Sequence, residues 1–410
     1  MAYNPANHIQ DLQYFGEFGG VNPSISDSST YTFLSAKTMF DTFEGNADGC
    51  YLYSRHSSPS NLYLGEALAA MEDTETANVS ASGMGAITSV LLQLCHSGDH
   101  VVSSRTIYGG TYAFLKNFAP RLGIETTFVN ITNVEQVEMA ITKNTKVLYC
   151  ESVSNPLLEI ADIKALSKIA KKHNLQLVVD NTFSPLSISP AKLGADVVVH
   201  SLTKFINGSS DTVGGAVCGS QDFINRLRNV HDGASMLLGS TMDSLRAASI
   251  LKNLRTLHIR MQQHSKNALF LAKKFEADGL KTVYPGLESH PSHNLFKKMM
   301  NAPYGYGGML TIDVGTIERA NDLMELMQHR NLGYLAVSLG FYKTLFSAPG
   351  TSTSSEISEN EQKTMGLSDG LIRFSIGLDA DIERTYNKMR TCMEELHILK
   401  PNLQSLNLGL

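Results

Sequence analysis

Short apolar segments alternate with an amphipathic segment in the middle of the chain. Four runs have the length of a strand, and they span residues 146–152, 175–182, 195–201 and 214–220. Between the first two, apolar side chains recur at helical spacing, at Ile163, Leu166, Ile169 and Ala170. This order of strand, helix and strand predicts an α/β fold with a mostly parallel central sheet and helices on both faces.

The pattern changes after about Leu251. Residues 251–279 predict one long charged helix, and residues 307–314 and 370–378 are separate strand candidates. We therefore expect a large domain over residues 56–250 and a smaller C-terminal α/β domain over residues 251–410. Residues 1–55 lack a clear period and predict an extended arm. The Ser/Thr/Glu-rich residues 350–362 predict a surface loop.

Composition and charge narrow the class of protein. The chain has 410 residues, 42% of them hydrophobic, which is enough to fill sizeable cores. Its net charge of -5 and its lack of basic runs argue against nucleic acid or an anionic membrane as the main partner. Five scattered cysteines show neither zinc spacing nor a disulfide framework. We therefore expect no metal site. No secretory signal or transmembrane run is visible, so we expect a cytoplasmic protein.

Two polar residues follow apolar strand candidates. Asp180 ends one run, and Lys204 follows the next. In open α/β sheets, ligands bind beyond the carboxyl ends of the strands. A lysine beside an apolar strand and near positive charge has a lowered pKa, which makes it a nucleophile toward an aldehyde. A Schiff-base lysine and an acidic partner for a ring nitrogen are what pyridoxal phosphate requires.

A phosphate site is the third requirement of this cofactor. The segment 80–95 predicts a helix that begins near Ser82, Gly83 and Met84, where free N–H groups and the helix dipole favour a phosphate. Ser201 and Thr203 would add hydroxyl donors. Each feature alone has a simpler interpretation, as a solvated lysine, a turn aspartate or an ordinary helix cap. Together they favour the cofactor.

Two other classes of protein share this alternation of strands and helices. A nicotinamide dinucleotide-binding protein is disfavoured because no G-x-G-x-x-G follows an early strand with an acidic residue about twenty positions later. A non-catalytic protein that has kept the fold is disfavoured by the presence of Lys204, Asp180 and Arg373.

Longer segments of the chain resemble the cysteine and methionine metabolism family of pyridoxal phosphate enzymes. They are YSRHSSPS, RTIYGGTYAF, VVDNTF and the segment around Lys204, and the similarity covers nearly the whole chain. YPGLESHPSHNLFKKMMNAPYGYGGML and VSLGFYKTLFSAPGTSTSSE look closest to the plant-type methionine gamma-lyases of this family. The resemblance implies the fold type I architecture of pyridoxal phosphate-dependent transferases.

The resemblance also implies roles for individual residues. Lys204 would carry the cofactor, Asp180 would pair with the pyridinium, and Tyr108 would stack on the ring and assist the leaving group. Within one subunit, the phosphate contacts would be Gly83, Met84, Ser201 and Thr203. Tyr53 and Arg55 would reach the phosphate of a neighbouring subunit, so the N-terminal arm would contact that subunit. The family implies a homotetramer, a dimer of active dimers.

The strand candidate 370–378 suggests how a substrate would be held. Ile372, Phe374 and Ile376 alternate with Arg373 and Ser375, so one face is core and the other presents Arg373 to a cavity or to water. A guanidinium can bind a carboxylate with two hydrogen bonds. The resemblance assigns Arg373 to the amino-acid carboxylate, with help from Asn155 and the Ser338 backbone. Read alone, the strand is equally consistent with an exposed arginine.

Three positions bear on the choice of amino acid. Cystathionine lyases and gamma-synthases usually carry a glutamate where this chain has Val337, and an apolar side chain suits a thioether instead. Gly110 replaces the cysteine of many bacterial methionine lyases, although plant-type members share the glycine. Ser209 stands where the family commonly has histidine, and we expect that difference to act outside the site itself.

We therefore predict a carbon–sulfur lyase that converts methionine to methanethiol, 2-oxobutanoate and ammonia. The alternatives are a cystathionine gamma-lyase and an enzyme of gamma-replacement on an O-acylated homoserine, because a thiol can attack the same intermediate. Elimination and replacement differ in the access of water and nucleophile, which the sequence does not distinguish.

Overall fold

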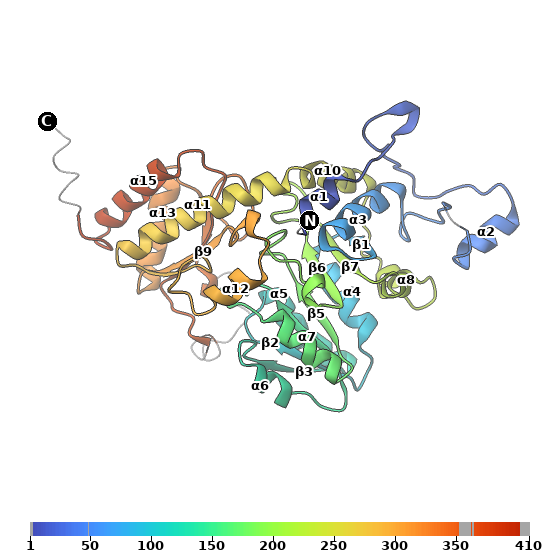
Figure 1. Ribbon diagram of the computed structural model, residues 1–410, viewed down its shortest axis with the longest axis horizontal. Helices are drawn as coiled ribbons and strands as arrows, with labels where there is room; N and C mark the ends of the chain where they lie inside the picture. The colour runs from blue at the N-terminus through green and yellow to red at the C-terminus, as the bar shows by residue number, and fades with distance from the viewer. Residues whose placement is uncertain (1–2, 48, 352–361, 363–364, 402–410) are drawn as a thin grey trace.

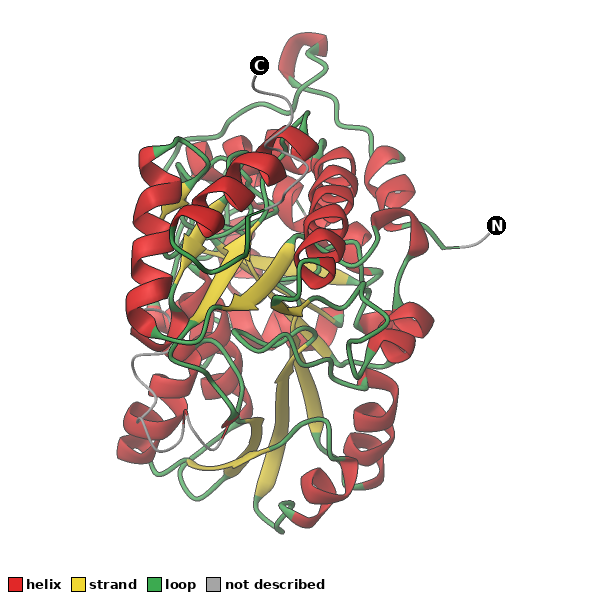
Figure 2. Ribbon diagram, turned by 90° about the vertical axis from the view of Figure 1, so that its left-hand side faces the viewer, coloured by secondary structure: helices red, strands yellow, loops and turns green. Residues whose placement is uncertain are grey.

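The computed structural model describes residues 3–47, 49–351, 362 and 365–401. Two β-sheets organise this part of the chain (Figure 1, Figure 2). The larger sheet has seven strands in the order β1-β7-β6-β5-β4-β2-β3, and the smaller has five in the order β10-β11-β12-β9-β8. Most of the predicted surface loop at residues 350–362 lies outside the described residues.

The larger sheet is parallel apart from one strand. Its members are β1 (Thr76–Ser80), β2 (His100–Ser104), β3 (Glu125–Val129), β4 (Thr145–Glu151), β5 (Gln176–Asp180), β6 (Val197–Ser201) and β7 (Gly215–Gly219). Strand β7 runs antiparallel to both of its neighbours, β1 and β6, while the other pairs are parallel. The predicted mostly parallel sheet is therefore confirmed.

Both faces of this sheet are covered by helices, because its central strands are apolar on both sides. In β4, Leu148 and Cys150 belong to the core on one face, and Val147 and Tyr149 to the core on the other. The first face packs against α3 (Pro59–Glu72), α6 (Val134–Met139), α7 (Ile163–Lys172) and α10 (Ser244–Leu254). The second packs against α4 (Gly83–Leu94), α5 (Gly109–Ala113) and α8 (Gln221–Arg228).

The smaller sheet forms a second core with its own helices. Its strands are β8 (Lys281–Val283), β9 (Met309–Asp313), β10 (Tyr334–Leu335), β11 (Leu345–Ser347) and β12 (Leu371–Ser375). The helices that pack on it are α11 (Leu257–Ala277), α13 (Ile317–His329) and α15 (Ile382–Glu395), while α12 (His293–Met299) lies against the core of the larger sheet. The structure thus contains the smaller α/β unit that the sequence predicts.

One helix prediction is wrong in detail. The segment 251–279 is not a single helix, because α10 ends at Leu254 and α11 begins at Leu257. At the break, the Asn253 carbonyl accepts hydrogen bonds from the Thr256 hydroxyl at 3.1 Å and from Arg260 Nη2 at 2.9 Å. These side-chain donors satisfy a carbonyl at the end of α10, so the interruption leaves it paired.

The first fifty residues divide into a packed part and a projecting part. Helix α1 (Pro5–Gln10) lies on α3, and the hydroxyls of Tyr3 and Tyr14 donate to the carbonyls of Met71 and Tyr63. Helix α2 (Ala36–Phe43) lies on a segment that extends away from the body (Figure 1). Several large apolar side chains in this N-terminal region are exposed, namely Phe15, Phe18, Val21, Leu34, Phe40 and Phe43.

The five cysteines are free, and they differ in exposure. Cys50 is exposed in the loop that follows α2, whereas burial raises the pKa of the thiols of Cys95, Cys150, Cys218 and Cys392. Within the described ranges, no helix combines the length and the apolar character that crossing a membrane demands.

Candidate active site

A cavity of about 220 Å³ lies beyond the carboxyl ends of β4, β5 and β6 and is closed by residues of the smaller domain. Ten of the predicted site residues line it: Gly83, Met84, Tyr108, Asn155, Asp180, Ser201, Thr203, Lys204, Val337 and Arg373. These residues come from segments that lie far apart in the sequence. Several strands of the α/β sheet end at the same edge, and this brings the residues together.

Lys204 enters the cavity from the turn after β6. Its Nζ donates a hydrogen bond to Ser338 Oγ at 3.1 Å, so Ser338 also reaches the site, here through its side chain. Burial, with a smaller contribution from the positive charge of Arg373, lowers the pKa of Lys204 to about 8. The amine is therefore partly neutral near physiological pH, and a neutral amine is a nucleophile.

Asp180 ends β5 with a buried carboxylate. Burial raises the pKa of Asp180, and hydrogen bonds from Thr182 and the nearby His200 oppose that rise. The Thr182 N–H donates to Asp180 Oδ1 at 2.9 Å. Asp180 lines the cavity. Its carboxylate can accept a hydrogen bond from a protonated ring nitrogen.

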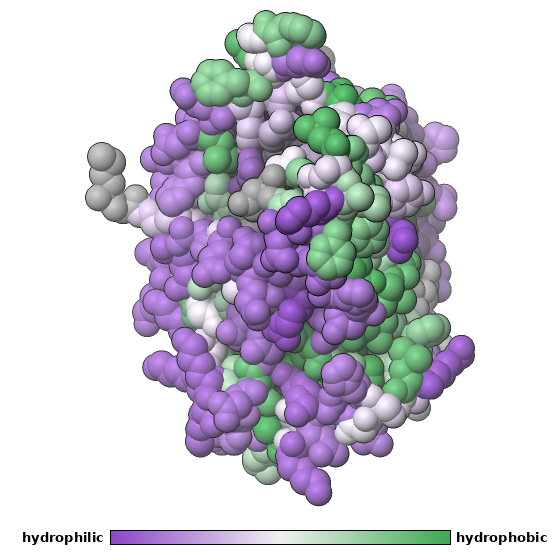
Figure 3. Space-filling view, turned by 90° about the vertical axis from the view of Figure 1, so that its right-hand side faces the viewer, coloured by the Kyte–Doolittle hydropathy of each residue, from purple (hydrophilic) through white to green (hydrophobic). Residues whose placement is uncertain are grey.

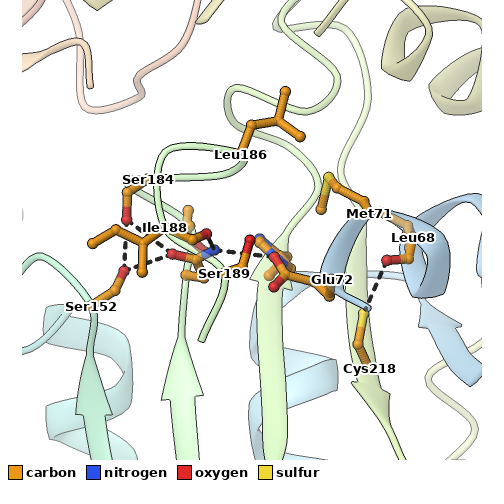
Figure 4. A network of polar contacts seen from close by, with 12 residues as sticks. Leu68, Met71, Glu72, Ser152, Ser184, Leu186, Ile188, Ser189 and Cys218 are labelled. Carbon is orange, nitrogen blue, oxygen red and sulfur yellow. Dashed lines mark hydrogen bonds and ion pairs between the residues drawn. The ribbon is translucent and has the colours of Figure 1, made fainter. Parts of the chain in front are cut away.

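A buried polar network links Ser152, the residue after β4, to Glu72 at the end of α3 (Figure 4). Ser152 donates its N–H to the Asp180 carbonyl at 2.9 Å and its hydroxyl to Asn181 Oδ1 at 2.8 Å. Asn181 Nδ2 donates to Glu72 Oε1 at 3.1 Å, and His200 Nε2 lies 2.7 Å from the same oxygen. This buried network joins the residue after β5 to His200 in β6 and to Glu72 at the end of α3.

Glu151 is a cavity residue that was not predicted from the sequence. It ends β4 directly opposite Asp180 in register. One oxygen of its carboxylate accepts the Tyr108 N–H at 2.7 Å, and the other accepts the Asn155 N–H at 2.8 Å. Burial and the neighbouring Asp180 raise the pKa of Glu151 well above its usual range. Glu151 thus holds the backbones of two predicted site residues at one point.

The start of α4 lies at the cavity wall. Ser82 Oγ caps the helix by accepting the Gly85 N–H at 2.9 Å. The N–H groups of Gly83 and Met84 have no acceptor within the described part of the chain, and both residues line the cavity. A Cβ on Gly83 would lie 2.8 Å from the Ser201 Cβ, so only glycine lets the helix approach β6 this closely.

Arg373 lies in the middle of β12 and points to the cavity, not to water. Its side chain is 3% exposed, and Nη1 donates to Asn155 Oδ1 at 2.9 Å. Burial lowers the pKa of Arg373 to about 10, and the Glu151 carboxylate opposes that shift. The guanidinium remains charged at neutral pH and, together with Asn155, can hold a carboxylate.

Tyr108 and Gly110 fit closely together. A Cβ on Gly110 would lie 2.6 Å from Tyr108 Cε1 and 3.2 Å from Met84 Sδ. A cysteine at this position would therefore press on the Tyr108 ring. Gly110 leaves space for the Tyr108 ring beside Met84.

Three residues singled out in the sequence lie elsewhere. Tyr53 and Arg55 do not line the cavity, and Arg55 Nη1 donates to the Met236 carbonyl in α9 (Ala234–Leu238) at 3.0 Å. Their role toward a neighbouring subunit stays a prediction. Ser209 is also outside the cavity lining, where its hydroxyl accepts a hydrogen bond from Asn253 Nδ2 at 3.2 Å.

The residues present fit pyridoxal phosphate. The cavity brings together an amine of lowered pKa for the aldehyde, a carboxylate for the ring nitrogen and two unpaired N–H groups at a helix start for the phosphate. A guanidinium for a substrate carboxylate lies on the opposite, smaller domain. The arrangement is that of a site for chemistry on an amino acid.

Comparisons with known proteins agree with this chemistry. A model of the Cys/Met metabolism PLP-dependent enzymes matches residues 7–385. The methionine gamma-lyase of Arabidopsis thaliana is 47% identical over 392 residues, covering 94% of this chain and 89% of that protein. The L-methionine gamma-lyase of Fusobacterium nucleatum subsp. polymorphum is 38% identical over 385 residues, covering 91% and 95%.

A solved structure extends the comparison to the cofactor. It is that of an O-acetylhomoserine (thiol)-lyase of Campylobacter jejuni subsp. jejuni, which contains a pyridoxyl-lysine phosphate. Its TM-score is 0.88 at 31% identity, covering 96% of this chain and 100% of that one. The expected resemblance is thus confirmed, and the chain belongs to the Cys/Met metabolism family of pyridoxal phosphate-dependent enzymes.

Proposed function

We propose that the protein is a methionine gamma-lyase, which eliminates methanethiol from methionine and releases 2-oxobutanoate and ammonia. The observation that carries this proposal is that the side chains of Val213, Val337 and Leu339, all apolar, line the cavity. Within the described residues, the carboxylates that line the cavity are Glu151 and Asp180, at the ends of β4 and β5. A methyl thioether matches an apolar wall, whereas the distal ammonium of cystathionine would lack a carboxylate beside Val337.

The proposed roles follow from position. Pyridoxal phosphate, when bound, supplies a ring that takes up the electrons released when C–H bonds of the amino acid break. Lys204 would hold the aldehyde end and then accept and return protons at the substrate carbons. Asp180 would keep the ring nitrogen protonated. Gly83, Met84, Ser201 and Thr203 would hold the phosphate.

The substrate would be positioned from the opposite side of the cavity. Arg373 would bind the substrate carboxylate while Asn155 holds the guanidinium in place. Tyr108 would give a proton to the departing sulfur, which is its predicted part in the reaction. Glu151 would not touch the substrate in this scheme, because both of its oxygens accept backbone N–H groups.

Comparing substrates tests the proposal. We expect kcat/KM for 2-oxobutanoate release to be higher with methionine than with cystathionine, since a buried ionic contact to the distal ammonium is worth on the order of 2–5 kcal/mol. Val337→Glu should move the preference toward cystathionine, and Val337→Leu is the apolar control. Faster turnover of cystathionine by the unaltered protein would contradict the methionine assignment.

Gamma-replacement is the second candidate function, because a solved structure similar to this chain is that of an O-acetylhomoserine (thiol)-lyase. The same cavity would admit a thiol in place of water. Assays with O-acetylhomoserine, with and without added thiol, separate the two functions. Turnover confined to O-acetylhomoserine plus thiol would replace the lyase proposal with this one.

Self-association is part of the proposal, as a homotetramer in the cytoplasm. Support comes from Tyr53 and Arg55, which lie outside the cavity of their own chain, and from the exposed apolar side chains of the N-terminal region. Apolar patches also lie among polar residues on the side from which α2 projects (Figure 3). Exposed apolar patches of this kind mark interaction surfaces.

A further inference from the structure

A second concave surface lies in the smaller domain. This basic groove encloses about 380 Å³, and its lining includes Tyr342, Lys343, Thr344, Asp379, Arg384 and Lys388. None of them lines the predicted catalytic cavity. A volume of this size lies in the range that small-molecule sites occupy.

Positive charge gathers in the groove without ion pairing. Among the described residues, Lys343, Arg384 and Lys388 form no ion pair with a carboxylate. Arg384 and Lys388 stand four residues apart on α15, a spacing at which like charges destabilise a helix by about 0.2–0.5 kcal/mol. A chain of net charge -5 thus places three cations in one hollow.

The carboxylate in the groove is already engaged. Asp379 Oδ1 accepts the Asp381 N–H at 2.9 Å, and Oδ2 accepts the Thr385 hydroxyl. Both oxygens therefore take part in the start of α15. Three cationic side chains and one carboxylate leave the groove with a net positive charge. A ligand that matches this charge is an anion with more than one negative charge.

We propose that the basic groove binds a small phosphate-bearing anion. A guanidinium matches two phosphate oxygens at once, and the two lysines add flexible point charges around it. The hollow shape sets this arrangement apart from an ordinary solvated cluster of lysines, because several cations can face one ligand. Lys343 Nζ lies 5.0 Å from the ring centroid of Tyr334, a weak contact that a phosphate can replace.

The groove and the catalytic cavity share two backbone segments. Residues 336–344 connect β10 to β11 and carry Val337 and Ser338 at one end and Lys343 at the other. Residues 375–378 follow Arg373. Three hydrogen bonds join the two segments: Gly340 N to Ser375 Oγ at 2.8 Å, Leu378 N to Tyr342 O at 2.7 Å, and Gly377 N to Thr344 Oγ1 at 3.0 Å. An anion held by Lys343 therefore contacts the segment that carries Ser338.

Inorganic pyrophosphate is a suitable probe, used on the protein loaded with pyridoxal phosphate so that the phosphate site at α4 is filled. Calorimetric titration at fixed ionic strength should show saturable binding. The triple variant Lys343→Gln, Arg384→Gln, Lys388→Gln should weaken that binding at least tenfold. Circular dichroism and cofactor absorbance would verify its folding, and if it fails to fold, Arg384→Gln alone should weaken binding at least threefold.

A matched control separates the groove from net charge. Lys164 and Lys168 are exposed and stand four residues apart on α7, and Lys143 is exposed in the turn before β4. Replacing these three by glutamine removes the same charge and should change pyrophosphate binding less than twofold. The proposal is overturned if the unaltered protein shows no saturable binding, if the groove variant binds equally well, or if the control variant loses as much affinity.

Hydrogen–deuterium exchange tests the link to the cavity without relying on activity. Pyrophosphate should slow exchange of the amides in residues 336–344 of the unaltered protein, and it should leave exchange unchanged in the groove variant. Slowing of the same amides in the groove variant would show that the probe acts from another place and would contradict the assignment.

Discussion

Lys204 changes its protonation state between pH 7 and pH 9. Its pKa of about 8 means that about a tenth of the amine is neutral at pH 7 and about nine tenths at pH 9. We therefore expect the rate of covalent cofactor attachment to the cofactor-free protein to rise with pH, with a midpoint near 8. Borohydride trapping followed by mass spectrometry measures it. A midpoint near 10.5, or trapping on the same peptide in Lys204→Ala, would contradict this expectation.

Glu151 acts through the backbones that it holds. In Glu151→Gln, an amide group would face the Tyr108 or Asn155 N–H, and an unpaired buried donor costs about 1–3 kcal/mol. We expect kcat/KM to fall by about 5- to 150-fold and the visible circular dichroism of the bound cofactor to change, because Tyr108 shifts.

Glu138→Gln is the control for this change, since Glu138 lies on the surface in α6 and pairs with Lys172. The positioning role of Glu151 is refuted if the cofactor spectrum of Glu151→Gln matches that of the unaltered protein while its activity falls.

Single residues could be predicted where the chemistry demands a residue type after a strand. Lys204, Asp180 and the helix start at Gly83 were accessible in this way, and all three line one cavity. Glu151 was not, because a glutamate at the end of an apolar run is also an ordinary strand end. Its importance depends on Tyr108 and Asn155, which only the fold brings within hydrogen-bonding distance.

At the scale of elements, the approach of α4 to β6 decides whether a phosphate can be held. Gly83→Ala would force its new Cβ against Ser201, displacing the first turn and its N–H groups. We expect cofactor affinity to fall at least tenfold, measured by equilibrium titration of the cofactor-free protein. Gly219→Ala in β7 is the control, because its Cβ would have no neighbour nearer than 3.4 Å. Equal loss in both variants would contradict a local effect.

Some strands could be predicted from the pattern of apolar residues in the sequence, and others could not. Strands β4 to β7 are continuous apolar runs because helices cover both faces, and the sequence predicted all four. Strand β3 lies at an edge and is partly exposed, so it carries no such run. The antiparallel direction of β7 was not predictable either, because apolar periodicity carries no information on strand direction.

At the scale of the whole molecule, Tyr53 and Arg55 raise the question of shared sites. If they serve a neighbouring subunit, Arg55→Ala and Lys204→Ala remove different parts of one site. Mixing the two variants should then give more activity than either has alone, because some hybrids contain one intact site. Absence of restoration, when subunit exchange has been demonstrated by mass, would count against a shared site.

The distribution of thiols offers a direct way to follow that assembly. Cys50 is exposed within the N-terminal arm of residues 1–55, while the other four cysteines are buried with raised pKa values. A maleimide dye should therefore label the native protein at a single position without any engineered substitution. Attached there, the dye would sense the arm's surroundings, so that its emission and its accessibility to quenchers would report each step by which copies of the chain come together.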